Sequence, residues 1–234
     1  VMLGFMKSDV DVGYYNAAIR IKSILVSIIT SLGTVLLPRA AYYIEHDLRE
    51  EFNYIARKSI NFVYIIALLM IIYFIVYAPE CIYFLSGNAY EGSILPMQIL
   101  MPTLLFIGLT NILGIQIMVP LEMEKWVLNS YIIGAIVDLI INILLIPKMG
   151  ASGAAIGTLI AEIAVMIYQY SKAKTRVREM FSEVDYKKLV CALIIGTVLT
   201  LGIKKIHMGY FVVLVVSASV FFGCYVIVLR ILKE

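Results

Sequence analysis

Four ionisable side chains, Arg20, Lys22, Asp138 and Glu162, lie inside stretches of sequence that are otherwise apolar. A charge within a membrane-spanning helix is costly, so such groups usually face a bundle interior or a watery cavity and have a partner there. Two cations suit the binding of an anion, and two carboxylic acids suit the binding of a cation or a proton. These side chains are therefore candidates for a substrate-binding or transport site.

Arg20 and Lys22 come about seven and nine residues into the first apolar stretch and point about 200° apart around a helix. Asn16 and Ser23 share the face of Arg20, at positions i−4 and i+3. Arg20 and Asn16 would bind an anion if this face lines a cavity. Otherwise Arg20 extends toward the membrane surface or pairs with an acid. Glu162, in the middle of the fifth stretch, is the predicted partner of one of the two cations.

Asp138 and Asn142 are spaced i, i+4 in the fourth apolar stretch and share one helix face with Gly134. This polar stripe has two interpretations. It lines a cavity or a cation or proton site, or it forms an interhelical hydrogen-bond pair that holds the bundle together.

Seven apolar stretches carry these side chains, and most have the ~20 residues that a helix needs to cross a bilayer. The chain is 62% hydrophobic and 15% charged, with a mean hydropathy of +0.95. Only helices and closed barrels satisfy the backbone in lipid, and these stretches lack the alternation of barrel strands. The sixth stretch, about 15 residues long, needs tilt or a thinner bilayer, or is re-entrant. The prediction is an all-α, polytopic membrane protein with spans near residues 12–37, 59–78, 93–119, 126–146, 151–170, 189–203 and 210–229.

The third stretch contains Pro96 and Pro102 together with Gly108, Gly114 and the polar Gln116. Proline removes a backbone hydrogen bond, so this helix is expected to bend. Interrupted helices in transporters line substrate paths, which makes Gln116 a further cavity candidate. The glycines are equally suited to close helix packing.

Lysine and arginine residues alternate between the predicted loops, as the positive-inside rule describes. Thirteen lie on the side of the loops that follow the first, third and fifth spans, and four lie on the other side. The first residues are therefore predicted outside and the carboxyl terminus in the cytoplasm. Because topology distributes these charges, the net charge of +3 does not indicate a nucleic-acid partner.

Sequence motifs for cofactors and catalysis are missing. Cys81, Cys191 and Cys224 have no CxxC or Cys/His spacing, so no metal site or disulfide framework is predicted. There is no GxxxxGK[ST] phosphate loop, and no Ser/His/Asp, paired-carboxylate or metal constellation. We expect no cofactor, no metal and no enzymatic activity.

Two motifs resemble a known family. The stretch NILLIPKMGASGAAIGT, with Asn142, Pro147, Gly150 and Gly153, is similar to a helix-loop-helix signature of the multidrug/oligosaccharidyl-lipid/polysaccharide exporter superfamily. The segments DVGYYNAA and SLGTVLLPRAA, the latter with Pro38, resemble the polysaccharide-type flippases within it. Pro147 is expected to end one helix, Gly150 and Gly153 to permit a tight turn, and the Gly/Ala run to let the next helix approach.

The resemblance implies two helical lobes around a central cavity, often with two additional carboxyl-terminal helices. This chain would supply the carboxyl-terminal lobe: residues 1–172 a bundle incomplete at its start, residues 173–188 a basic cytoplasmic loop, and residues 189–234 the additional helices. Asp138 stands where many relatives have an uncharged residue such as Asn. Because the chain starts with Val1 and residues 1–6 read as the end of an apolar helix, we expect it to be a fragment.

By resemblance, the function is to move polyprenyl-diphosphate-linked oligosaccharides across the bacterial inner membrane for surface polysaccharides such as O-antigen, lipopolysaccharide or exopolysaccharide. The partners implied are the lipid-linked oligosaccharide, membrane lipids, and a polysaccharide polymerase with other assembly proteins. Two alternatives remain open. One is a cation-coupled drug antiporter in which Asp138 and Glu162 exchange the ion, and the other is a non-transporting scaffold for polysaccharide assembly.

Overall fold

The structure of the chain is a computed structural model that describes residues 2–181, 186–202 and 209–231. Helices are the only regular elements in these ranges and none of the described residues forms a strand, which confirms the all-α prediction. In chain order the elements are α1 (Met2–Met6), α2 (Asp9–Glu45), α3 (Arg49–Val76), α4 (Ala78–Ser86), η1 (Asn88–Ser93), α5 (Ile94–Leu100), α6 (Thr103–Thr110), η2 (Asn111–Met118), α7 (Glu124–Met149), α8 (Ala151–Phe181), α9 (Tyr186–Leu201) and α10 (Tyr210–Ile231).

Five helices, α2, α3, α7, α8 and α10, are long and apolar enough to cross a membrane. The segments Asn88–Leu100 and Thr103–Met118 pass the same test together, as one bent span. α9 is a shorter apolar helix over Leu189–Leu201. The chain is therefore a multi-pass membrane protein, with up to six spans of full length among its described residues and α9 as a short candidate for a seventh.

The bent span confirms the kink expected from its prolines. The segments Asn88–Leu100 and Thr103–Met118 meet at an angle of 45°, and Pro102 lies in the break between them. Its ring removes an N–H donor from the helical ladder. Further along, η2 is a π-helix, and the Val119 amide donates to the Gly114 carbonyl five residues earlier, at 3.0 Å. Both departures from α-helical geometry fall in the same span.

Two other prolines do not end their helices, which for Pro147 is contrary to the expectation. α2 continues through Pro38 to Glu45, and α7 continues through Pro147 to Met149. Gly150 ends α7, because its φ of 53° departs from helical geometry. Residues with a Cβ atom adopt this left-handed conformation only with strain, so glycine is suited to the position. Gly150 therefore makes the predicted tight turn, whereas Gly153 lies inside α8.

α8 also extends beyond its predicted end, because its buried face continues. Ala173, Val177 and Met180 follow one another at helical spacing and are at most 3% exposed. They keep α8 helical as far as Phe181, so the predicted start of a loop at residue 173 is wrong. α9 then begins at Tyr186, and residues 182–185 of the predicted loop lie outside the described residues.

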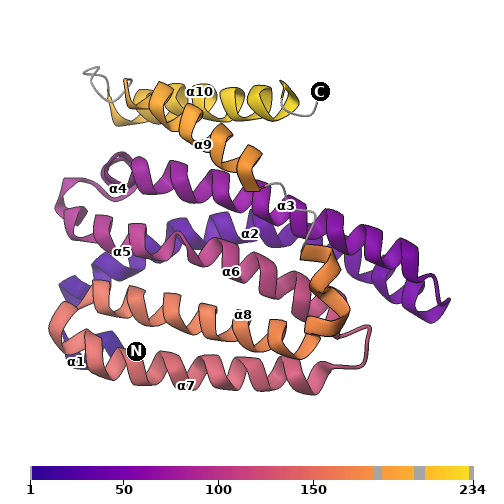
Figure 1. Ribbon diagram of the computed structural model, residues 1–234. Helices are drawn as coiled ribbons and strands as arrows, with labels where there is room; N and C mark the ends of the chain where they lie inside the picture. Colours follow the sequence, from indigo (N-terminus) through magenta and orange to yellow (C-terminus); the bar gives the residue numbers. More distant parts are fainter. Residues whose placement is uncertain (1, 182–185, 203–208, 232–234) are drawn as a thin grey trace.

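The helices form layers that Figure 1 shows clearly. α2 to α6 occupy the middle, the α7–α8 hairpin covers one side, and the α9–α10 pair covers the other. The α7–α8 turn and the amino end of α10 lie at one end of the bundle (Figure 1). The α2–α3 turn and the segment before α7 lie at the opposite end.

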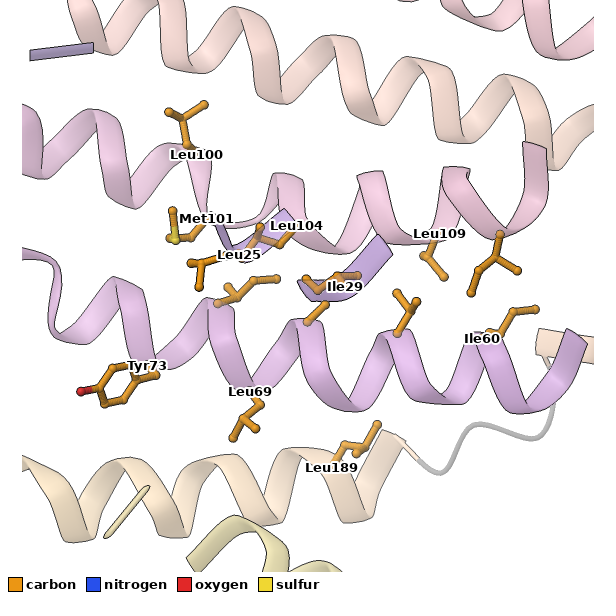
Figure 2. Close-up of a cluster of buried hydrophobic side chains, with 14 of the residues drawn as sticks. Leu25, Ile29, Ile60, Leu69, Tyr73, Leu100, Met101, Leu104, Leu109 and Leu189 are labelled. Carbon is orange, nitrogen blue, oxygen red and sulfur yellow. The ribbon is translucent and has the colours of Figure 1, made fainter. Parts of the chain in front are cut away.

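The core lies between α2, α3 and the bent span. Figure 2 shows Leu25 and Ile29 of α2 among Ile60, Leu104 and Leu109, and each of these five side chains is at most 5% exposed. In a bilayer, apolar packing between helices gains little from the hydrophobic effect. The dispersion energy of close contacts and interhelical hydrogen bonds therefore hold this core together.

Tyrosine hydroxyls attach the α9–α10 pair to the middle layer. Tyr77 of α3's carboxyl end donates to the Thr200 carbonyl at 2.7 Å, and Tyr73 donates to the Leu214 carbonyl at 2.9 Å. Tyr225 of α10 donates in return to the Ile65 carbonyl at 3.2 Å. The predicted additional helices are thus packed on the bundle through polar contacts as well as apolar ones.

Candidate functional site

Three of the predicted site residues, on α2, α7 and α8, lie within electrostatic range of one another where α8 packs against the other two helices. The ammonium of Lys22 interacts electrostatically with the carboxylates of Glu162 and Asp138, and all three side chains are half-buried. Within the described part of the chain, neither acid forms a direct salt bridge with Lys22. We call Lys22, Asp138 and Glu162 the charged cluster. Lys22, rather than Arg20, is therefore the electrostatic partner of Glu162.

Asp138 is held by Asn142, one turn further along the same helix. The Asn142 amide donates to Asp138 Oδ2 at 2.9 Å. This hydrogen bond lies within α7. It is therefore not the interhelical hydrogen bond that one of the two interpretations of the polar stripe required. Asp138 Oδ1 and Asn142 Oδ1 are buried and have no hydrogen-bond partner in the described structure. The pair therefore has two buried acceptor oxygens without a described partner, one of them within the charged cluster.

Glycines allow α8 to approach this polar stripe of α7. A Cβ atom at Gly157 would collide with Asn142 Oδ1, and one at Gly134 would lie 2.5 Å from Val165. At Gly153 it would lie 2.5 Å from the backbone oxygen of Leu145. The small residues of the hairpin thus set the distance between the helices that carry Asp138 and Glu162, as the Gly/Ala run predicted.

The two motifs that carried the family resemblance touch each other. Asp11 Oδ1, near the start of α2, accepts a hydrogen bond from the Ala151 amide at the start of α8, at 3.4 Å. One turn further, the hydroxyls of Tyr15 and Thr158 are 2.8 Å apart. A carboxylate at the amino end of a helix is also favourable for the helix dipole. These contacts place α2 against α8 and so bring Lys22 to the acids.

Tyr15 and Thr158 were missed as site residues, although a signal was present in the sequence. Tyr15 precedes Lys22 by seven positions, and Thr158 precedes Glu162 by four. Both spacings put the two residues on one helix face. Following the face of each charged residue along its helix would have identified them.

Arg20 and Asn16 lie on a different face of α2 and are exposed. Together with Ser23 and Ser27, which are also exposed, they form a stripe, interrupted by the exposed Ile24, that we call the polar face of α2. Among the described residues, neither Arg20 nor Asn16 has a hydrogen-bond or ion-pair partner. The charged cluster and the polar face therefore use opposite sides of one helix.

The outer surface of α7 is of a different kind. Its exposed side chains between the ends of the helix are mostly apolar and include Ile132, Ile136, Leu139, Ile140 and Ile143, each about half exposed. Such a surface suits lipid tails, and the polar face of α2 does not. The contrast separates a lipid-facing surface from one that needs water or a polar ligand.

Gln116 does not join either group. It is 4% exposed and lies in η2, where a Cβ atom at Gly33 of α2 would collide with Asn111 and come within 2.7 Å of Gln116 Nε2. Its Nε2 has no hydrogen-bond partner among the described residues. The structure therefore places this cavity candidate inside a helix interface, because the π-helical segment turns it toward α2.

A charged cluster carried by three membrane spans, with a polar helix face on the other side of α2, defines a polytopic helical membrane protein with an internal polar site. Within the described ranges, no three His, Cys, Asp or Glu side chains are grouped to hold a metal ion. The sequence profile described as lipid II flippase MurJ matches residues 7–222, and the chain belongs to this family. The superfamily recognised from the sequence motifs is thereby confirmed.

Individual relatives agree with this assignment. An uncharacterized membrane protein of Methanocaldococcus jannaschii is 26% identical over 214 residues, which are 92% of this chain and 42% of the relative. A putative O-antigen transporter of Shigella dysenteriae is 26% identical over 177 residues, 74% of this chain and 43% of that protein. A putative O-antigen transporter of Escherichia coli is 24% identical over 165 residues, 70% of this chain and 40% of that protein. The chain spans less than half the length of each.

A solved structure shows the same fold. The lipid II flippase MurJ in an inward closed conformation superposes with a TM-score of 0.79 at 16% sequence identity. The match covers 95% of this chain and 47% of that protein. The helices of this chain are therefore arranged as in one part of a larger membrane protein.

Proposed function

We propose that this chain forms one lobe of a flippase that moves lipid-linked oligosaccharides across a membrane. The observation that carries the proposal is the polar face of α2, which leaves Arg20 exposed and unpaired among the described residues in the middle of a bundle whose outer surface is apolar. Such a face is suited to line a hydrophilic cavity rather than to contact lipid. The family assignment supports a transport role rather than an enzymatic one.

In this proposal the substrate is a polyprenyl-diphosphate-linked oligosaccharide. The Arg20 guanidinium would bind the diphosphate, because its fork of N–H donors forms two charge-assisted hydrogen bonds with a phosphate. Asn16 and Ser23, on the same face, would bind sugar hydroxyls. Lys22, turned away toward Glu162 and Asp138, would hold α2 against the hairpin instead of touching the substrate.

The pathway we propose is surface polysaccharide assembly at the bacterial inner membrane. Two relatives named as putative O-antigen transporters support it. The amino end of α2 would face outside and the carboxyl terminus the cytoplasm, as the distribution of lysine and arginine predicts. The lobe would rock against a second one so that the polar face opens to either side in turn. Polysaccharide polymerase and other assembly proteins would be its partners.

A cation-coupled antiporter of the same superfamily is the second candidate. The unpartnered Oδ1 atoms of Asp138 and Asn142 favour it, because buried acceptor oxygens suit a bound cation or proton. Sodium- or proton-dependent efflux of cationic dyes, lost in Asp138→Asn, would distinguish it from the flippase. A scaffold without transport activity would instead copurify with assembly proteins while flipping no lipid.

The flippase proposal is tested by replacing Arg20 in cells that depend on the gene carrying this chain. We expect Arg20→Ala to reduce glycan export at least tenfold, since charged hydrogen bonds are worth roughly 1.5–3 kcal/mol each. Ile24→Ala is the matched control, one turn along α2 and also exposed, and it should export normally. Surface glycan and membrane insertion are measured together. Normal export by Arg20→Ala would remove the polar face from the mechanism.

A further inference from the structure

A cavity of about 370 Å³ lies at the end of the bundle that carries the α2–α3 turn, away from the charged cluster near the middle of α7 and α8. It opens where α2 ends, α3 begins and α8 reaches its last turns. Arg49, Asn53, Arg176 and the acidic Asp47 supply polar groups to its wall, and Ile44, Phe52, Leu121 and Met180 supply apolar ones. Its volume falls in the usual range of roughly 300–1,000 Å³ for ligand pockets. We call it the end pocket.

Two guanidinium groups, from different helices, determine which ligand the end pocket suits. Arg176 is exposed and has no partner among the described residues. Arg49 Nε donates to Asp47 Oδ1 at 2.8 Å, and both side chains are more than 80% exposed. An exposed ion pair contributes little free energy, so an incoming phosphate can displace Asp47, whose competition lowers the affinity by only a few-fold. Arginine pairs with phosphate through two parallel hydrogen bonds, which favours a phosphate group between the two.

The end pocket lies at the level of the membrane surface. Lys172 Nζ stands 4.4 Å from the centre of the Trp126 ring and 5.5 Å from that of Tyr168. Tryptophan and tyrosine gather at the membrane interface, and lysine ends reach the headgroups there. Arg176 follows Lys172 by one helical turn, so it lies about 6 Å further from the middle of the membrane along α8. It therefore lies where lipid phosphates are found.

The apolar part of the wall distinguishes a lipid from a free ion. Phe52 and Met180 are 4% and 3% exposed, and they place an apolar floor beneath the arginines. Inorganic phosphate has no group to contact such a floor, whereas the glycerol and upper acyl chain of a phospholipid do. The combination of cationic rim and apolar floor matches a lipid at the interface.

We propose that the end pocket binds the phosphate headgroup of an anionic phospholipid, with Arg49 and Arg176 as its ligands. Arg176 follows Glu162 by fourteen positions, about 21 Å along α8, so this site is separate from the charged cluster. The proposal does not depend on the flippase function. The bound lipid would attach the lobe to one leaflet through the start of α3 and the last turns of α8.

The test measures lipid binding to the full chain in detergent by native mass spectrometry, with phosphatidylglycerol and phosphatidylcholine as probes. We expect a clear preference for phosphatidylglycerol and a loss of roughly tenfold in its affinity in Arg176→Gln. Arg178→Gln is the matched control. It removes the same charge from the same helix two positions away, about 200° around, and it should bind like the unmodified chain. Asp47→Asn should bind several-fold more tightly, because Arg49 loses its competitor.

Equal losses in Arg176→Gln and Arg178→Gln would overturn the proposal, because a diffuse attraction between charges would then explain the binding. Asp47→Asn provides an independent readout in the opposite direction if Arg176→Gln does not fold, and unchanged or weaker binding by that variant would also overturn the proposal. A parallel calorimetric titration with inorganic phosphate identifies the source of the ligand. Phosphate binding as tight as that of phosphatidylglycerol would exclude a lipid site.

Discussion

Two cations only two positions apart in α2 have different surroundings. Lys22 is half-buried and faces Glu162 and Asp138, whereas Arg20 is exposed and has no described partner. Their separation of about 200° around the helix makes this possible. We infer that Lys22 stabilises the packing of α2 against the hairpin, and that Arg20 is available for a ligand. Stability and transport should therefore respond differently to the two residues.

Lys22→Ala should lower the free energy of unfolding by roughly 1–3 kcal/mol, because two half-buried carboxylates lose their counter-charge. The expected loss is smaller than the cost of about 3–5 kcal/mol for removing one partner of a fully buried pair, because these side chains are only half-buried. Replacing Glu162 as well, in Lys22→Met/Glu162→Gln, should recover part of the loss. Denaturant unfolding in detergent measures both variants. Arg20→Ala is the control and should change stability by less than about 0.5 kcal/mol. A loss in Arg20→Ala equal to that in Lys22→Ala would contradict the division of roles.

At the scale of elements, the α7–α8 hairpin depends on small residues at defined positions. Gly153 faces the backbone oxygen of Leu145, which cannot move as the tip of a flexible side chain can. Gly157 in turn leaves room for Asn142, which holds Asp138. The glycines of this hairpin therefore affect the charged cluster through the helix separation.

Gly153→Ala should lower the free energy of unfolding by about 1–3 kcal/mol, the usual range for overpacking, because the new methyl group would lie 2.5 Å from a backbone oxygen. Gly223→Ala, in α10, is the matched control, since nothing lies within 4 Å of its added Cβ. The control should be neutral or more stable by up to about 1 kcal/mol, from helix propensity alone. Thermal unfolding in detergent compares the two. Equal effects would show that the hairpin is not closely packed at Gly153.

For the whole molecule, alternating helix directions place the described connections between the spans at two ends (Figure 1). Aromatic pairs mark one end, where the rings of Tyr83 and Tyr210 are 5.3 Å apart. The other end carries Lys172 over Trp126. Aromatic side chains at both ends are typical of a bundle whose ends lie at the two membrane interfaces.

The predicted orientation can be tested with single cysteines in a chain whose three native cysteines have been replaced. Asn88→Cys should react with a membrane-impermeant maleimide in intact cells, and Lys125→Cys only after permeabilisation, because they lie at opposite ends of the bent span. Gly209→Cys decides whether α9 crosses the membrane. It should label from outside if α9 crosses, and from inside if α9 is re-entrant. The reverse pattern at residues 88 and 125 would contradict the orientation.

The sequence by itself determined the features that depend on local chemistry and on the bilayer. A membrane helix must be long and apolar, so the spans were readable, and proline removes a donor wherever it stands, so the bend at Pro102 was readable too. The turn at Gly150 follows from its freedom to adopt a positive φ. The polar stripe of Asp138 and Asn142 follows from helical periodicity.

Only the tertiary structure decided which faces meet. Periodicity puts Arg20 and Lys22 on different faces but does not say which one turns toward Glu162. That choice depends on the contacts of Asp11 and Tyr15 with α8, which join residues about 140 positions apart. The burial of Gln116 and the extension of α8 likewise depend on neighbours distant in sequence. The physical reason is that one helix fixes the relative directions of its side chains, whereas their partners are set by packing between helices.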